Sequence, residues 1–349
     1  MSETLSVPTS GNPTGEALSA MTAVFAPSAT AAFGGRVAAQ LGRPLSAHEE
    51  REFAGGEHKI RSLEGVRGRS VYVIQSLWGD EAGSANDRLC RLLFFIGALK
   101  DAGASKLTAC LPYLAYARKD RRTKARDPVT SRYVAQIIEA VGTARVITVD
   151  VHNLAAFDNA FRCESVHLEA TGIFVRHFAA DREAGDRVVV SPDIGGIKRA
   201  RHFQEVLERA LQRPVGFGFM DKKRSEGVVS GDTLVGPIRG AHVILIDDLI
   251  SSGTTLLRAT DACRRAGATR VDVAATHATF TPQAHRLFDP RGPDSVVVTD
   301  SVTLHGSYSP YLDRSLKVLE IAPLFAEAIR RLELHSGSLS QLGGLYTTA

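Results

Sequence analysis

The sequence is poor in cysteine and has no long apolar segment. Its 349 residues include only 4 cysteines, which are widely spaced and form no Cys-x-x-Cys pair. This spacing argues against a zinc site or a disulfide framework and is typical of thiols in a reducing compartment. No apolar run approaches the roughly 20 residues of a membrane-spanning helix, and the N-terminus lacks the pattern of a secretory signal. These absences predict a cytoplasmic protein without a membrane partner.

The sequence also lacks a large net charge. Its 42 Lys and Arg and 38 Asp and Glu give a formal net charge of +4. That balance suits small anionic substrates and is too weak to predict nucleic acid as a partner. Apolar content of 44% and charged content of 23% are those of a globular protein, and the length suffices for two domains.

Strand-like apolar runs alternate with amphipathic helix patterns along most of the chain. We expect strands at 71–76, 107–113, 145–150, 187–193, 243–249, 271–277, 295–299 and 316–321. Helix patterns lie between them, including one at 86–102 that Asn86 and Asp87 would cap. The alternation predicts an α/β protein with two similar doubly wound domains, whose sheets are mainly parallel.

The expected domain limits follow from this series of elements. Residues 1–20 are rich in Ser, Thr, Pro and Gly and predict a disordered tail. We expect a first α/β domain over 21–168 and a second over 169–322. Residues 323–349 would then form a C-terminal helix and tail.

The most informative stretch runs from 243 to 256. Four apolar residues lead into Asp247 and Asp248, and a helix pattern follows a short polar loop. The loop consists of Ser251, Ser252, Gly253, Thr254 and Thr255. A strand, a small-residue loop and a helix N-terminus bind phosphate through unpaired backbone N–H groups and the helix dipole. The two carboxylates suit sugar hydroxyls or a metal ion, whereas a simple helix cap would need only one of these hydroxyls.

A basic loop follows the predicted strand at 107–113. Residues 118–126 hold six cations in nine positions: Arg118, Lys119, Arg121, Arg122, Lys124 and Arg126. Ligands of open parallel sheets bind beyond the carboxyl ends of the strands, and Arg and Lys pair well with phosphate oxygens. The position therefore favours a polyphosphate site over two alternatives, a solvated loop and a nucleic-acid patch.

Two more side chains at predicted strand ends suit a metal ion. His152 follows the strand at 145–150, and Asp193 precedes two glycines. Both have structural alternatives, because a lone His often has a structural role and an Asp can cap a helix. Residues 220–231 are basic and punctuated by glycine, which predicts either a mobile arm or a charged hairpin tip. Together these parts suit phosphoryl transfer.

The order of these motifs resembles that of the ribose-phosphate diphosphokinase (PRPP synthetase) family from about residue 23 to 346. The matching segments are Val66-Arg-Gly, Val71 to Ser76, Asn86-Asp87, Pro112-Tyr113, Tyr116-Ala-Arg118, Asp120-Arg-Arg, Val149 to His152, Val190 to Gly196, Val235-Gly236 and the stretch 243–256. The resemblance implies transfer of the diphosphoryl group of Mg-ATP to the C1 hydroxyl of ribose 5-phosphate, with release of AMP.

The resemblance also implies a role for each matching residue. ATP would be bound by Phe53, Glu57, Arg118, Lys119, Asp120 and His152. Mg²⁺ would be held by His152 and Asp193, and the transferring group would be stabilised by Lys222 and Arg224. Ribose 5-phosphate would be bound by Asp247, Asp248 and the loop from Ser251 to Thr255. Phe53 and Glu57 match a turn that holds adenine across a subunit interface, so a homo-oligomer, hexameric or dimeric, is expected.

Several positions depart from the family's pattern. Gly55 replaces an Asp in the adenine turn, and Lys119 replaces a usual Gln. Ser251 and Thr254 replace the Asp and a Gly of the common Asp-Thr-Gly-Gly-Thr loop. These changes predict a divergent member with altered kinetics, donor choice or regulation. A non-catalytic regulatory subunit and a phosphoribosyltransferase remain as alternatives, although the second would have no use for the basic loop.

Overall fold

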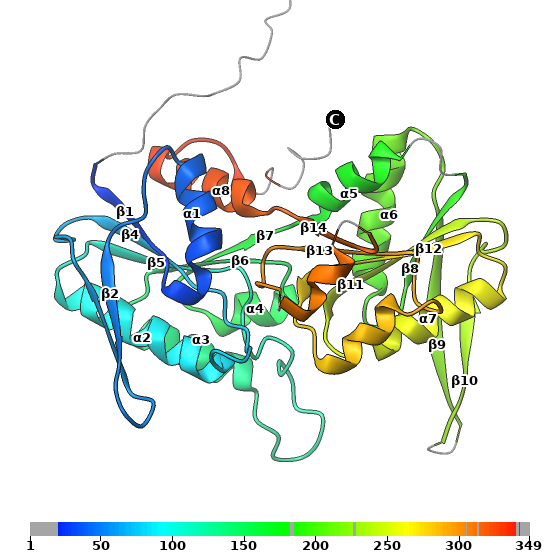
Figure 1. Cartoon of the computed structure of the whole chain (residues 1–349), viewed down its shortest axis with the longest axis horizontal. Coiled ribbons are helices and arrows are strands. Elements are labelled where there is room, and N and C mark those ends of the chain that lie inside the picture. Colours follow the sequence, from blue (N-terminus) through cyan, green and yellow to red (C-terminus); the bar gives the residue numbers. More distant parts are fainter. Residues whose placement is uncertain are drawn as a thin grey trace, which may run out of the picture.

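The computed structural model describes residues 20–181, 185–225, 228–304, 306–312, 314–339 and 342, without the side chains of 222–232. The predicted tail lies almost wholly outside this part of the chain. The described residues form two α/β units, built on sheets of five and seven strands (Figure 1). The predicted fold class is therefore confirmed.

The first sheet is entirely parallel, in the order β1-β4-β5-β6-β7. Its strands are β1 (Thr22–Phe25), β4 (Ser70–Ile74), β5 (Lys106–Leu111), β6 (Arg145–Val149) and β7 (Glu164–Leu168). The helices of this unit are α1 (Ala31–Gln40), preceded by the 3-10 turn η1 (Ser28–Thr30), α2 (Ala85–Asp101), α3 (Thr130–Ala140) and α4 (Leu154–Ala160). The central strands are buried on both faces, as continuous Val, Ile and Leu runs require.

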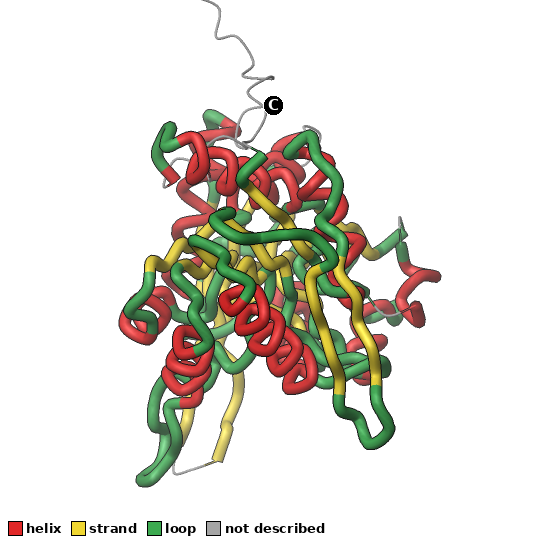
Figure 2. Tube along the Cα trace, turned by 90° about the vertical axis from the view of Figure 1, so that its left-hand side faces the viewer, coloured by secondary structure: helices red, strands yellow, loops and turns green. Residues whose placement is uncertain are grey.

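A separate antiparallel hairpin of β2 (His48–Glu52) and β3 (His58–Ser62) lies against α2. The imidazole of His58 stacks on Phe94 of α2, with ring centroids 5.4 Å apart. His58 belongs to the ladder pair next to the turn, so α2 supports the hairpin close to its tip, and the turn extends beyond this contact (Figure 2).

The second sheet has the order β10-β9-β8-β11-β12-β13-β14, and only the β9–β10 pair is antiparallel. Its strands are β8 (Arg187–Ser191), β9 (Gly216–Ser225), β10 (Val228–Val235), β11 (His242–Ile250), β12 (Arg270–Ala278), β13 (Ser295–Thr299) and β14 (Leu316–Leu319). The helices are α5 (Thr171–Ala180), α6 (Ile197–Leu211) and α7 (Thr254–Arg265), with 3-10 segments η2 (Pro282–Phe288) and η3 (Gly306–Tyr311).

The last helix, α8 (Ala322–Leu334), follows the second sheet but packs on the first unit beside α1 (Figure 1). Phe325 meets Phe33 of α1 edge to face, and Glu333 accepts a hydrogen bond of 2.8 Å from each of Ser70 and Tyr72. These contacts tie the end of the chain to the first sheet. The domain limits expected from the sequence, at 168/169 and 322/323, remain a proposal.

One predicted helix start is wrong. The N-cap of α2 is Ser84 rather than Asn86 and Asp87. Ser84 Oγ accepts from the backbone N–H of Asp87 at 3.2 Å, and the Asp87 carboxylate accepts from the N–H of Ser84 at 2.7 Å. This reciprocal pair satisfies two backbone donors, so the helix begins one turn before the apolar stripe.

Candidate active site at the junction of the two sheets

The carboxyl ends of strands from both sheets meet at one cavity. The walls include Tyr113 after β5, His152 after β6, Asp248 of β11 and His277 of β12, with Arg118 from the basic loop. His152 and Asp248, predicted at the edges of the two units, are thus neighbours although 96 positions separate them in the chain. The cavity lies between the domains, where parallel α/β sheets bind ligands.

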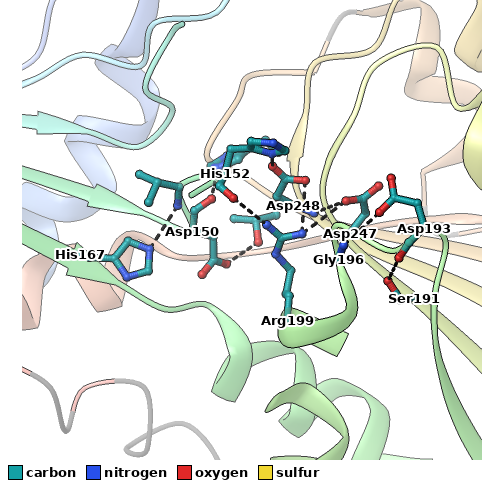
Figure 3. A network of polar contacts seen from close by, with 12 residues as sticks. Asp150, His152, His167, Ser191, Asp193, Gly196, Arg199, Asp247 and Asp248 are labelled. Carbon is teal, nitrogen blue, oxygen red and sulfur yellow. Dashed lines mark hydrogen bonds and ion pairs between the residues drawn. The ribbon is translucent and has the colours of Figure 1, made fainter. Parts of the chain in front are cut away.

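A network of four ionisable side chains crosses this junction (Figure 3). His152 Nδ1 lies 2.7 Å from Asp248 Oδ2, which joins the first unit to the second. Arg199 of α6 places Nη1 3.5 Å from Asp247 Oδ1 and 3.4 Å from Asp248 Oδ1. Asp247 Oδ1 in turn accepts from the backbone N–H of Asp248 at 2.8 Å. The two carboxylates therefore share the guanidinium of Arg199, and Asp248 alone also contacts the imidazole of His152.

The two aspartates of this network differ in electrostatics. Burial raises the pKa of Asp248, but the hydrogen bond from His152 and the charge of Arg199 outweigh burial and hold that pKa well below its usual range. Burial and the adjacent Asp248 carboxylate raise the pKa of Asp247 well above its usual range. Asp248 is thus the strong, charged acceptor, and Asp247 keeps its proton to higher pH than an ordinary Asp.

Asp193 lies beside Asp247 in the same view, where it contacts Ser191 and Gly196 (Figure 3). Its Oδ1 accepts from the backbone N–H of Gly196 at 3.0 Å, but Gly196 and not Asp193 is the N-cap of α6, so the predicted helix-capping alternative is wrong. A Cβ on Gly196 would come within 2.8 Å of Ser191 Oγ, which explains the glycine at this tight turn. The other carboxylate oxygen of Asp193 has no protein partner among the described residues and is available to a ligand.

The predicted phosphate loop forms between β11 and α7. Gly253 has φ +71°, and a Cβ there would meet the Leu287 side chain at 2.7 Å. Only glycine fits this position without strain. Ser252 Oγ lies 3.1 Å from Thr254 Oγ1, at the first residue of α7. Hydroxyls and helix N–H groups thus gather at one place, as phosphate binding requires.

The basic loop is organised by one of its own carboxylates. Asp127 accepts from Lys119 Nζ at 2.7 Å, from Thr123 Oγ1 at 2.6 Å and from the N–H of Lys124 at 3.0 Å. These hydrogen bonds, that of Lys119 first, hold the pKa of Asp127 well below its usual range. Asp120 accepts from Asn153 Nδ2 at 2.7 Å, which ties the loop to the residue after His152.

Comparisons with known proteins agree with this geometry. A family model for the N-terminal domain of ribose phosphate pyrophosphokinase matches residues 22–142, and one for the phosphoribosyl synthetase-associated domain matches 230–343. The ribose-phosphate pyrophosphokinase of Wolinella succinogenes is 36% identical over 320 residues, covering 91% of this chain and 98% of the relative. The chain belongs to the ribose-phosphate pyrophosphokinase family.

Two further similarities support this membership. The ribose-phosphate pyrophosphokinase of Caldanaerobacter subterraneus subsp. tengcongensis is 38% identical over 309 residues, which are 88% of this chain and 92% of that protein. The crystal structure of phosphoribosylpyrophosphate synthetase from Mycobacterium smegmatis superposes with a TM-score of 0.81 at 31% identity. That superposition covers 90% of this chain and 99% of the other.

Not every residue that the resemblance implied lies at the cavity. Phe53 is 42% exposed and lies with Glu57 at the tip of the β2–β3 hairpin, where the N–H of Phe53 donates to the Glu57 carbonyl at 2.8 Å. Figure 1 shows this hairpin projecting away from the junction. Within one chain, the adenine turn and the phosphate sites therefore stay apart.

The predicted cationic arm is the β9–β10 hairpin, which projects from the same side of the molecule as the β2–β3 hairpin (Figures 1 and 2). In the backbone register, Lys222 pairs with Asp232 and Arg224 pairs with Val229. Their side chains lie outside the description, so their roles remain predictions. The backbone here is that of an antiparallel hairpin, as the second of the two sequence interpretations expected.

Sequence reasoning assigned no role to two residues at the junction. Arg199 neutralises the aspartate pair, and His277 forms part of the cavity wall. Both positions follow the rule that led to Asp193, namely that ligands of parallel sheets bind beyond the carboxyl ends of the strands. Arg199 is in the first turn of the helix after β8, and His277 is near the carboxyl end of β12. Extending that rule to every strand end would have found them.

The described residues contain no cluster of three or more His, Cys, Asp and Glu side chains that could hold a metal ion by themselves. Among the same residues, no helix is long and apolar enough to span a membrane.

Proposed function

We propose that the junction of the two sheets is the active site in which the diphosphoryl group of Mg-ATP passes to the C1 hydroxyl of ribose 5-phosphate, releasing AMP. The observation that carries this proposal is the interdomain contact of 2.7 Å between His152 and Asp248. It joins the side of the cleft that carries the basic loop to the side that carries the phosphate loop. Two substrates bound to these loops would meet at this contact.

The second unit supplies the ribose 5-phosphate site. The N–H groups at the start of α7, with the hydroxyls of Ser252, Thr254 and Thr255, bind the 5-phosphate. Ser251 and Gly253 shape the loop around it. Asp247 and Asp248 accept hydrogen bonds from the ribose hydroxyls, and the low pKa of Asp248 keeps it a charged acceptor throughout the neutral range.

The first unit supplies the polyphosphate site. Arg118 reaches the cavity and binds phosphate oxygens, and Lys119 adds charge beside it. Asp120 holds the loop to Asn153, next to His152. His152 and Asp193 would hold Mg²⁺, which when bound neutralises the phosphates and favours their transfer.

The two hairpins complete the site. Lys222 and Arg224 of the β9–β10 arm stabilise the charge of the diphosphoryl group during transfer. The separation of Phe53 and Glu57 from their own cleft supports adenine binding by a second copy of the chain, and so a homo-oligomer of two or six subunits. All four cysteines are free thiols, which supports a cytoplasmic location.

The direct test is AMP release from ATP, with Mg²⁺ and ribose 5-phosphate present and each omitted in turn. We expect AMP only when both are present, together with equimolar PRPP detected by ³¹P NMR. AMP formed without ribose 5-phosphate would indicate a different acceptor. No AMP with any nucleoside triphosphate would overturn the catalytic proposal in favour of a regulatory subunit.

A further inference from the structure

The turn that carries His152 has an unusual backbone. Asp150, two residues before His152, has φ +42°, a left-handed conformation that few residues other than glycine adopt. Such a conformation persists only where the surroundings hold it in place. Within the first unit, the Asp150 N–H donates to Leu168 O at 3.0 Å. The N–H of Ala170, the N-cap of α5, lies 3.3 Å from Asp150 Oδ2.

The Val151 N–H also donates to His167 Nε2 of the first unit at 3.2 Å, and further contacts of this turn come from the second unit. Thr276 Oγ1 donates a short hydrogen bond to Asp150 Oδ2. His277 is only 4% exposed, and its Nε2 lies 3.3 Å from the Asp150 carbonyl oxygen. Because a carbonyl can only accept, Nε2 carries the proton here. The other ring nitrogen of His277 lies 2.9 Å from Ser301 Oγ.

The network continues to a second point of contact between the units. Ser76, after β4 of the first sheet, donates from its hydroxyl to the carbonyl oxygen of Ser301. The Tyr113 ring packs edge-on against His277 at 5.1 Å. His277 is therefore fixed from three sides, and the turn at Asp150 rests on a rigid support.

We propose that Thr276 and His277 are positioning residues, which hold the Asp150 turn so that His152 points at Asp248. β11 and β12 are adjacent strands, and Leu249, next to Asp248, pairs in register with His277. Asp150 and His152 of the first unit are thus bound to neighbouring strands of one sheet. The inference rests on the proposed role of His152 toward Mg-ATP. It extends that role to residues of the opposite domain.

The test compares the variants Thr276→Val and Thr148→Val. Thr148 lies on β6, and its buried hydroxyl has no hydrogen-bond partner among the described residues, so this control removes the same atom without breaking a contact. We expect Thr276→Val to lower kcat by about 10- to 100-fold through misplacement of His152. The Mg²⁺ concentration for half-maximal rate should rise, and the KM for ribose 5-phosphate should stay within about twofold. Thr276→Ser should restore the rate.

A second readout uses the metal-free protein. In histidine-labelled enzyme, the ring signals of His152, assigned with His152→Gln, should shift in Thr276→Val and remain in place in Thr148→Val. Unchanged kinetics and unchanged His152 signals in Thr276→Val would overturn the inference. A loss of affinity for ribose 5-phosphate as large as the loss of affinity for Mg²⁺ would also overturn the inference, because that result indicates a general structural role.

His152→Gln also separates this inference from the proposed function. If His152→Gln impairs use of Mg-ATP while Thr276→Val does not, the positioning inference is wrong and the proposed site stands. If His152→Gln leaves the Mg²⁺ and ATP dependence intact, the assigned role of His152 is wrong, and the inference is overturned with it.

Discussion

The two sheets present chemically different edges to the cleft they share. The edge of the first unit carries a loop with six cations in nine positions and the imidazole of His152. The edge of the second unit carries Asp193, Asp247, Asp248 and a loop of hydroxyls at a helix N-terminus. A polyphosphate and a sugar phosphate need these two kinds of partner. Two units of similar architecture therefore bind two different substrates, because different residues follow their corresponding strands.

The two edges also differ in how they are held in place. The phosphate loop is fixed by Gly253 against Leu287 and by the start of α7. The basic loop lacks regular secondary structure and depends on Asp127, a half-buried carboxylate with several donors around it. We therefore expect substitutions in the basic loop to have graded effects and those at the second edge to have sharper ones.

The largest expected effect concerns Lys222. This cation belongs to the second unit and is therefore an exception to the division between a cationic first edge and an acidic second edge. If the arm stabilises the transferring group, Lys222→Ala should lower kcat by about 10³-fold or more, with little change in either KM. Steady-state kinetics with both substrates measure this. Lys223→Ala removes the same charge from the neighbouring position and should cost far less. Equal losses in the two variants would mean that only the overall charge of the arm matters.

A smaller effect is expected from Arg199→Met, which removes a cation from the acidic edge. Without Arg199, Asp247 and Asp248 repel each other and the pKa of Asp248 rises, so the ribose contact weakens. We expect the KM for ribose 5-phosphate to rise by about 10- to 100-fold. The matched control is Lys198→Met, an exposed cation of the same helix turn. A larger change in the KM for ATP than for ribose 5-phosphate would contradict the division of the edges.

In the basic loop, Asp127→Ala should release Lys119 and Thr123 and loosen the loop. We expect the KM for ATP to rise by about three- to tenfold, while the KM for ribose 5-phosphate stays constant. Asp158→Ala, at an exposed position of α4, controls for the loss of one negative charge. A lower KM for ATP in Asp127→Ala would show instead that Asp127 competes with the nucleotide for Lys119.

The smallest effect is on stability. Because the folded-state pKa of Asp247 is raised, its contribution to stability is fully present below the ordinary Asp pKa and is lost as pH rises through the folded-state value. Above that value the charged form opposes folding. Asp247→Asn should therefore raise the melting temperature by roughly 1–3 °C at pH 8 and less at pH 4, although it impairs catalysis. A melting temperature that falls at pH 8 would contradict the raised pKa.

Much of the fold was accessible from the sequence because its signals are local. Long apolar strands such as β11 and the amphipathic helix α6 each contain enough periods to be recognised. The helix α4 has only seven residues and contains no clear period. The strand β7, Glu-Ser-Val-His-Leu, has only two apolar residues and lacks the continuous Val-rich run of β8, which has the same length, so the sequence predicted neither element. The cap of α2 was misplaced because Asn86 and Asp87 are themselves good capping residues.

Prediction of the site from the sequence was also limited to local signals. Each loop was predicted from its own composition, but contacts between distant residues were not. His152 and Asp248 are 96 positions apart, and Thr276 and Asp150 are 126 apart. No spacing rule connects such pairs before the two sheets are placed together. The pairing of Lys119 with Asp127 was also missed, because charge density alone does not show which cations are already neutralised.

The most direct test of the division between the edges is a comparison of Arg118→Ala with Thr255→Ala. The KM for ATP and for ribose 5-phosphate would be measured in both variants at saturating Mg²⁺. Arg118→Ala should raise the KM for ATP by about tenfold and leave that for ribose 5-phosphate within twofold, and Thr255→Ala should do the reverse. If both variants affect the same substrate, or if the two effects are exchanged, the two edges do not divide the substrates in this way.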